Sequence, residues 1–149
     1  MSEHQISETF KEEQLRKLQN FNVAVYHSKN ALMIAAGVLL ASVVVGYAFA
    51  HEMPKTVDLL LFTVVFISFL ALSFWTQKKP YAALRLAVVI YLFYILINML
   101  PFISTYGVEG ILKGLYSGCL YKIIIITVIA KATPKAKAMQ SLHDEIING

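Results

Sequence analysis

Four long apolar stretches constrain this chain more than any other feature of its sequence. They cover approximately residues 31–50, 57–76, 81–103 and 108–130. A helix needs roughly 20 apolar residues to cross the hydrocarbon core of a bilayer, and each stretch meets that length. The connections between the stretches are short, so consecutive helices run antiparallel. The sequence therefore predicts an all-α membrane protein with four transmembrane helices in an up-down-up-down bundle.

The composition agrees with lipid as the solvent. The sequence is 58% hydrophobic and 15% charged, whereas soluble domains contain roughly 45–50% apolar and about 25% charged residues. The net charge of +4 does not indicate nucleic-acid binding here, because the basic residues border the apolar stretches. A single cysteine, Cys119, excludes an intrachain disulfide framework and any paired-cysteine metal or redox motif.

Lysine and arginine are distributed very unevenly between the two sides of the predicted bundle. Three groups lie before the first stretch, around the second connection and after the fourth stretch, whereas on the other side the first connection has only Lys55 and the third has none. Basic residues are retained in the cytoplasm during insertion. We therefore expect a multi-pass protein of the inner (plasma) membrane with a cytoplasmic N-terminus and a cytoplasmic C-terminus. The three groups are Lys11, Arg16, Lys17 and Lys29; Lys78, Lys79 and Arg85; and Lys131, Lys135 and Lys137.

The pattern divides the chain into residues 1–29, 30–131 and 132–149. The first part predicts a cytoplasmic amphipathic helix, the second is the four-helix transmembrane domain, and the third is a cytoplasmic tail. The amphipathic helix either docks a partner or lies in the inner headgroup layer. The tail forms either a short surface helix or a frayed end. One face of the amphipathic helix carries Ile6, Phe10, Leu18, Phe21 and Val25, with Leu15 off it.

Lys122 is the ionisable residue that most needs an explanation, because it lies near the middle of the fourth stretch. It continues a row of glycines spaced by four, Gly110, Gly114 and Gly118, which predicts a seam where another helix packs closely. Lys122 then faces the same side as this seam. It either contacts an anion or substrate or lines a pore, or it snorkels toward the cytoplasm or pairs with a tyrosine or a carbonyl.

A second group of polar residues is expected near the outer surface. Asp58 opens the second stretch, Asn98 lies near the outer end of the third, and Glu109 and Lys113 lie one turn apart in the fourth. Glu109 and Lys113 form an i,i+4 pair in the favourable order. The group is either a ligand contact or a salt bridge at the membrane boundary.

The sequence lacks the constellations on which membrane enzymes depend. No paired histidines lie within the spans for haem, a single cysteine cannot support thiol–disulfide exchange, and no H-E-x-x-H or Gly-rich phosphate loop occurs. The first stretch also lacks the deep carboxylate on which small four-helix multidrug exporters rely. We therefore expect no catalytic residue, no metal site, no cofactor and no enzymatic activity.

About half of the chain resembles small uncharacterised bacterial four-helix integral membrane proteins. The features that carry the resemblance are a Lys-Pro turn, an aromatic third span, and a fourth span of glycines and isoleucines leading into an Ala/Lys helix. The resemblance implies a four-helix fold and no known activity. These features are Lys79-Pro80; Tyr91, Phe93 and Tyr94; Gly114, Gly118 and Lys122 to Ile126; and Lys131 to Ala138.

The function predicted from the sequence is that of a small non-enzymatic membrane protein. We expect it to self-associate or to serve as an accessory subunit of a membrane complex, with the lipid bilayer, copies of itself or other membrane subunits as partners. The evidence is the glycine seam of the fourth span and the small residues Gly37, Ala41, Ser42 and Gly46 of the first. The alternative is a homo-oligomeric channel or carrier for small or anionic solutes, with Lys122 and Lys113 along the path.

Overall fold

The computed structural model describes residues 3–50, 56–116 and 118–148. For residues 3–10, 46–47, 49–50, 56–57, 113, 115 and 142–148 it describes the backbone alone. All regular secondary structure in the described residues is helical, which confirms the all-α prediction. The helices are α1 (Glu3–Ala50), α2 (Thr56–Trp75), α3 (Pro80–Tyr106), α4 (Val108–Tyr116) and α5 (Cys119–Asn148).

Three of the described helices are long and apolar enough to cross a membrane. They are α1, α2 and α3, with the apolar windows inside Lys11–Val45, Asp58–Trp75 and Pro80–Tyr106. Large apolar side chains cover much of the outer surface of these helices and remain exposed. Such a surface is stable only when lipid or another protein covers it.

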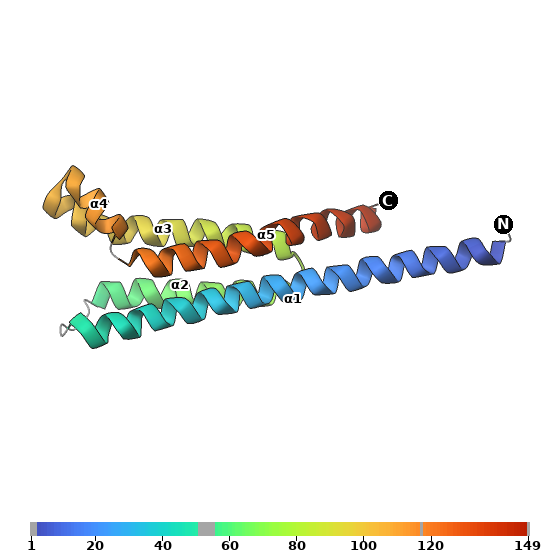
Figure 1. Ribbon diagram of the computed structural model, residues 1–149, viewed down its shortest axis with the longest axis horizontal. Coiled ribbons are helices and arrows are strands. Elements are labelled where there is room, and N and C mark those ends of the chain that lie inside the picture. The colour runs from blue at the N-terminus through green and yellow to red at the C-terminus, as the bar shows by residue number, and fades with distance from the viewer. Residues whose placement is uncertain (1–2, 51–55, 117, 149) are drawn as a thin grey trace.

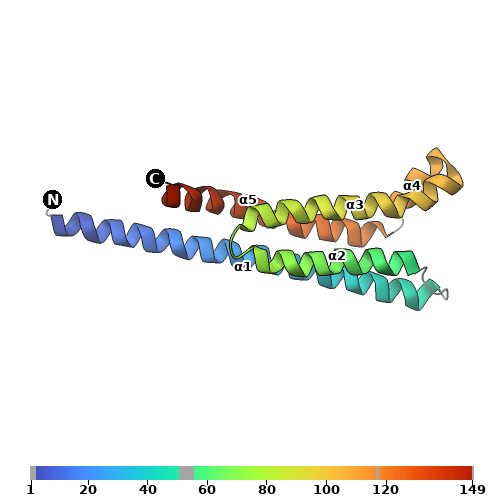
Figure 2. The same cartoon turned by 180° about the vertical axis from the view of Figure 1, so that it is seen from behind.

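The long helices form two layers, with α1 and α5 in one layer and α2 and α3 in the other (Figures 1 and 2). The helices α1 and α5 run antiparallel and both termini lie at the same end of the molecule, which we call the terminal end (Figure 1). At this end α1 and α5 continue past the α2–α3 turn as a two-helix stalk.

The core is built from small residues on three helices and larger ones between them. Alanines face inward on α1, α3 and α5, which lets these helices approach closely. The rings of Phe69 and Tyr91 fill the centre, with their centroids 6.1 Å apart. The fully buried alanines include Ala35, Ala83, Ala87 and Ala136, and the larger core residues include Leu32, Leu39, Leu84, Ile125 and Ile129.

Neither predicted boundary at residues 29–30 and 131–132 coincides with a helix end. The sequence around Lys29 and Asn30 contains no glycine or proline, so α1 runs unbroken for 48 residues, about 72 Å at 1.5 Å per residue. The tail is likewise the continuation of α5, which passes through Pro134 to Asn148. The amphipathic segment and the tail are therefore not separate helices but the stalk ends of α1 and α5.

The fourth predicted span is not one helix, and this corrects the sequence prediction. Residues 108–130 are divided between α4 and α5, with Gly118 at φ +64°. The turn before α4 lies in the predicted connection between residues 103 and 108, because α3 continues through Pro101 and the chain turns at Gly107 with φ +58°. A positive φ favours glycine, which has no Cβ to clash with the backbone. Hydrophobicity alone did not reveal the turn at Gly118.

Two contacts fix the helices relative to one another at the terminal end. The side-chain carbonyl of Gln140 on α5 accepts hydrogen bonds from the backbone N–H groups of Tyr81 (3.2 Å) and Ala82 (3.3 Å). These donors lie in the first turn of α3, where they have no partner within the helix. In the second contact, the Lys29 amine of α1 lies 5.8 Å from the ring centroid of Phe74, near the end of α2. The stalk is thereby tied to both ends of the α2–α3 turn.

Candidate functional site

Lys122 lies directly after the break between α4 and α5. Its side chain is only 8% exposed, and its Nζ donates a hydrogen bond to the carbonyl of Gly114 at 2.7 Å. Gly114 belongs to the last turn of α4, whose carbonyls have no helical N–H to bind. The negative end of a helix dipole also favours a nearby cation. Lys122 therefore caps the C-terminus of α4, and among its interpretations the contact with a carbonyl is the one observed.

The three glycines of the predicted seam have two different roles. On α4, a Cβ at Gly110 would collide with the backbone carbonyl of Phe102, and one at Gly114 would lie 3.0 Å from Met99 Cγ. These two glycines therefore pack α4 tightly against α3 within the chain. Gly118 lies in the turn before α5, where a Cβ would collide with the Tyr121 ring. The glycines do not form a single row on one helix, because the helix is broken.

The four residues of the predicted outer cluster lie on α2, α3 and α4. Asp58 and Glu109 are exposed, and the Asn98 amide donates to its own helix at the Tyr94 carbonyl, 2.8 Å away. The side chain of Lys113 lies outside the described residues, so its pairing with Glu109 stays a prediction. The ion pair that is described lies far away on the stalk, between Lys17 and Glu13 at 2.9 Å.

Two further observations concern chemistry in the described part of the chain. Tyr91 is buried among the core residues, and its hydroxyl has no hydrogen-bond partner there. No group of three or more His, Cys, Asp or Glu residues lies close enough to hold a metal ion in the regions that the structure describes.

The outward face of α1 carries a glycine with surroundings unlike those of α4. Nothing lies within 4 Å of the position that a Cβ on Gly37 would take. Around it, apolar and polar residues recur at alternating spacings of three and four, which we call the α1 stripe. It consists of Val23, Tyr26, Asn30, Met33, Gly37, Leu40 and Val44. Asn30 is half-buried, and the other members are exposed.

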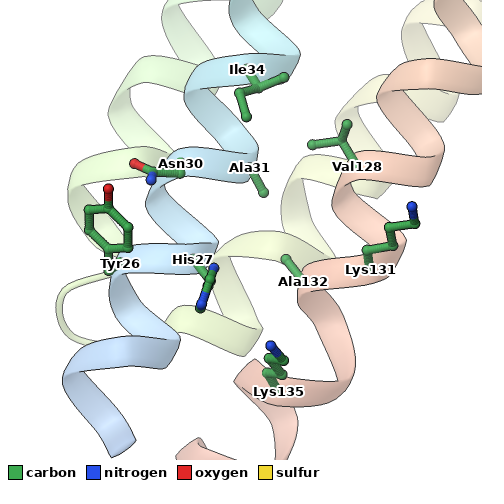
Figure 3. Close-up of a pocket in the computed structure, with 9 residues that line it drawn as sticks. All are labelled: Tyr26, His27, Asn30, Ala31, Ile34, Val128, Lys131, Ala132 and Lys135. Atoms are coloured by element: carbon green, nitrogen blue, oxygen red, sulfur yellow. The ribbon is translucent and has the colours of Figure 1, made fainter. Parts of the chain in front are cut away.

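A groove of about 420 Å³ separates α1 from α5 where the stalk joins the bundle. Figure 3 shows His27 directed into the gap from α1, with Lys131 and Lys135 along the α5 wall. Ala31 and Ala132 line the middle of the gap, and their small side chains leave it open. The remaining lining residues are Tyr26, Asn30, Ile34 and Val128.

A second groove, of about 470 Å³, continues along the stalk and shares Lys135 with the first. It passes Ala24 and Val23 on α1 and Pro134 and Met139 on α5. Sequence reasoning used Lys131 and Lys135 for orientation only and missed the grooves. The i,i+4 spacing of these lysines around Ala132 predicts one basic helix face with a small residue on it. It does not predict a groove, because the other wall is α1, about 100 residues away in the sequence.

Comparisons with protein-family models, with curated proteins and with solved structures found no match for this chain.

Proposed function

We propose that the protein is a non-enzymatic, multi-pass membrane protein that self-associates through the α1 stripe. The observation that carries the proposal is the open space at Gly37. A glycine inside a helix costs about 0.5–1 kcal/mol relative to alanine, so one in the apolar span of α1 with no intrachain neighbour needs another reason. Close approach of a second helix is the usual reason in membranes.

The spacing of the stripe favours a second copy of the chain as the partner. Alternating steps of three and four keep one face directed at a partner along a left-handed pair of helices. In a dimer with its two-fold axis along the membrane normal, the two α1 helices run parallel at the same depth, and residues beside the axis meet their own copies. A polar residue such as Asn30 within an apolar stripe specifies that register. The stripe carries no charge, so self-pairing meets no repulsion.

The proposed topology has four crossings, with the terminal end in the cytoplasm. The chain reaches the far end through α3 and returns through α4 and α5 together, so both termini lie on one side (Figure 1). A broken helix is compatible with a bilayer where other protein groups bind its free backbone, as Lys122 does for Gly114. The excess of Lys and Arg at the terminal end supports a cytoplasmic location.

The same face would also suit an accessory subunit bound to a larger membrane complex. The channel or carrier alternative has less support, because Lys122 is bound to a carbonyl of its own chain instead of facing a path. The hydrogen bond between Lys122 and Gly114 gives no reason for the protein to select an anionic solute. No described observation favours a second function over self-association.

The mass of the purified protein in mild detergent tests the proposal, with Gly37→Leu as the decisive variant. We expect the unmodified chain to be a dimer and Gly37→Leu to be a monomer with unchanged helicity, because the leucine meets nothing within its own chain. Ile126→Leu on α5 is the control, since it changes an exposed apolar residue outside the stripe. A monomeric unmodified chain, or a dimer that survives Gly37→Leu, would reject the proposal.

A further inference from the structure

The groove between α1 and α5 has a polarity that self-association does not explain. Its lining includes the two lysines Lys131 and Lys135 and the imidazole of His27, and it includes no carboxylate. Neither lysine forms an ion pair with a described side chain. Lys135 lies near His27 and the Lys131 amine lies on the outer side of α5, so two cations border the gap without a carboxylate in its lining (Figure 3).

The groove also changes character along its length. The lysines, His27 and Asn30 lie toward the stalk, whereas Ile34 and Val128 lie farther into the bundle (Figure 3). The polar part is level with the end of α2, since Lys29 lies over the Phe74 ring. The apolar part therefore borders the region where α1 and α2 become apolar spans.

We propose that this groove binds an anionic phospholipid of the cytoplasmic leaflet. Its phosphate lies between Lys131 and Lys135, where His27 supplies a further hydrogen-bond donor, and an acyl chain lies along Ile34 and Val128. Basic pockets between membrane helices on the cytoplasmic side are suited to anionic headgroups. The apolar half gives a lipid an advantage that a free phosphate ion lacks, because only a lipid fills it.

Native mass spectrometry of the full chain in mild detergent tests the charge requirement. Phosphatidylglycerol and phosphatidylcholine are titrated separately against the protein and against the double variant Lys131→Gln/Lys135→Gln. We expect phosphatidylglycerol to bind the unmodified chain more tightly than phosphatidylcholine, and the double variant to lose about tenfold or more of its phosphatidylglycerol affinity, given the contribution of each lysine near an anionic lipid. The phosphatidylcholine affinity stays unchanged.

The matched control removes the same charge elsewhere at the terminal end. Lys78→Gln/Lys79→Gln changes two exposed lysines of the α2–α3 turn that do not line the groove. We expect this variant to keep the phosphatidylglycerol affinity within about twofold of the unmodified chain, since its groove lysines are intact. An equal loss in both double variants would show general charge attraction and would overturn the proposal.

A steric variant tests the acyl-chain half without changing charge. Ile34→Trp fills the apolar part of the groove, and Ile126→Trp places the same ring on an exposed site of α5 outside it. We expect weaker phosphatidylglycerol binding for Ile34→Trp alone. Equal binding by both tryptophan variants, or displacement of the lipid by inorganic phosphate at matched concentration, would contradict a lipid site. Tyr26 and Asn30 belong to both the groove lining and the α1 stripe. The two proposals fail separately all the same, because Lys131, Lys135 and Ile34 lie outside the stripe and Gly37 lies outside the groove.

Discussion

Gly37 of α1 and Gly110 of α4 are both helical glycines in apolar segments, but their surroundings are opposite. A Cβ on Gly110 would collide with the Phe102 carbonyl, whereas one on Gly37 would meet nothing within 4 Å. The packing of the single chain requires a glycine at position 110. It does not require one at position 37, so the space beside Gly37 is available to a partner. The comparison separates a glycine that the packing of the chain requires from one that is open to the proposed partner.

Helix α1, which carries Gly37, and helix α4, which carries Gly110, also differ in how much of their surface the rest of the chain covers. The unbroken α1 exposes one face along much of its length, while α4 and α5 share the return through the bundle and use their special residues internally. Lys122 caps α4, Gly110 and Gly114 pack it on α3, and Gly118 forms the turn. The glycines and the lysine that make residues 110–122 unusual for an apolar segment therefore form contacts within the chain.

The largest expected effect is that of Gly110→Val. The valine cannot fit against the Phe102 backbone, so α4 has to separate from α3. We expect a destabilisation of about 3 kcal/mol, at the upper end of overpacking effects. Thermal unfolding followed by circular dichroism in detergent measures it. Gly37→Val is the matched change on α1, and an equal loss of stability in both variants would remove the contrast between the two helices.

Lys122→Met sharpens the account of the break between α4 and α5. The methionine replaces the apolar stem of the lysine and leaves the Gly114 carbonyl without its donor, which costs about 1–3 kcal/mol and is partly offset by removing a buried charge. We expect a net loss of about 1–2 kcal/mol and faster hydrogen exchange confined to residues 114–122. Lys137→Met, at an exposed site on the same helix, is the control. Unchanged exchange at the break would show that Lys122 does not hold α4.

The smallest expected effect has the opposite sign. Gly37→Ala removes backbone freedom without a clash, so we expect the monomer to gain about 0.5 kcal/mol while the dimer weakens. Unfolding at low and high protein-to-detergent ratio separates the two effects. A variant that is less stable under dilute conditions would indicate an intrachain neighbour for Gly37.

Apolar length and loop length were enough to predict the helical class and the presence of three long apolar helices. They did not predict that α1 joins its amphipathic and apolar parts, because the pattern changes near Lys29 while no residue there stops a helix. The break at Gly118 was also missed. The spacing of four that predicts a seam is equally compatible with a glycine needed for positive φ, and only the backbone distinguishes the two.

The candidate sites show the same limit. Lys122 was identified because a charge in an apolar segment is unusual, but its partner was set by the turn that brings it back to Gly114. The groove depends on His27 and Lys131, which are 104 positions apart in the sequence. Such sites form only where two helices that are distant in the sequence pack together, and the sequence of either helix alone does not show which helix it packs against.

Cross-linking in intact membranes tests the central claim most directly. In a Cys119→Ser background, single cysteines replace Leu40 of the α1 stripe or Ile126 on the exposed face of α5. After oxidation we predict a covalent dimer for Leu40→Cys, lost when Gly37→Leu is added, and none for Ile126→Cys. No dimer through Leu40→Cys, or equal dimer through Ile126→Cys, would contradict self-association through α1.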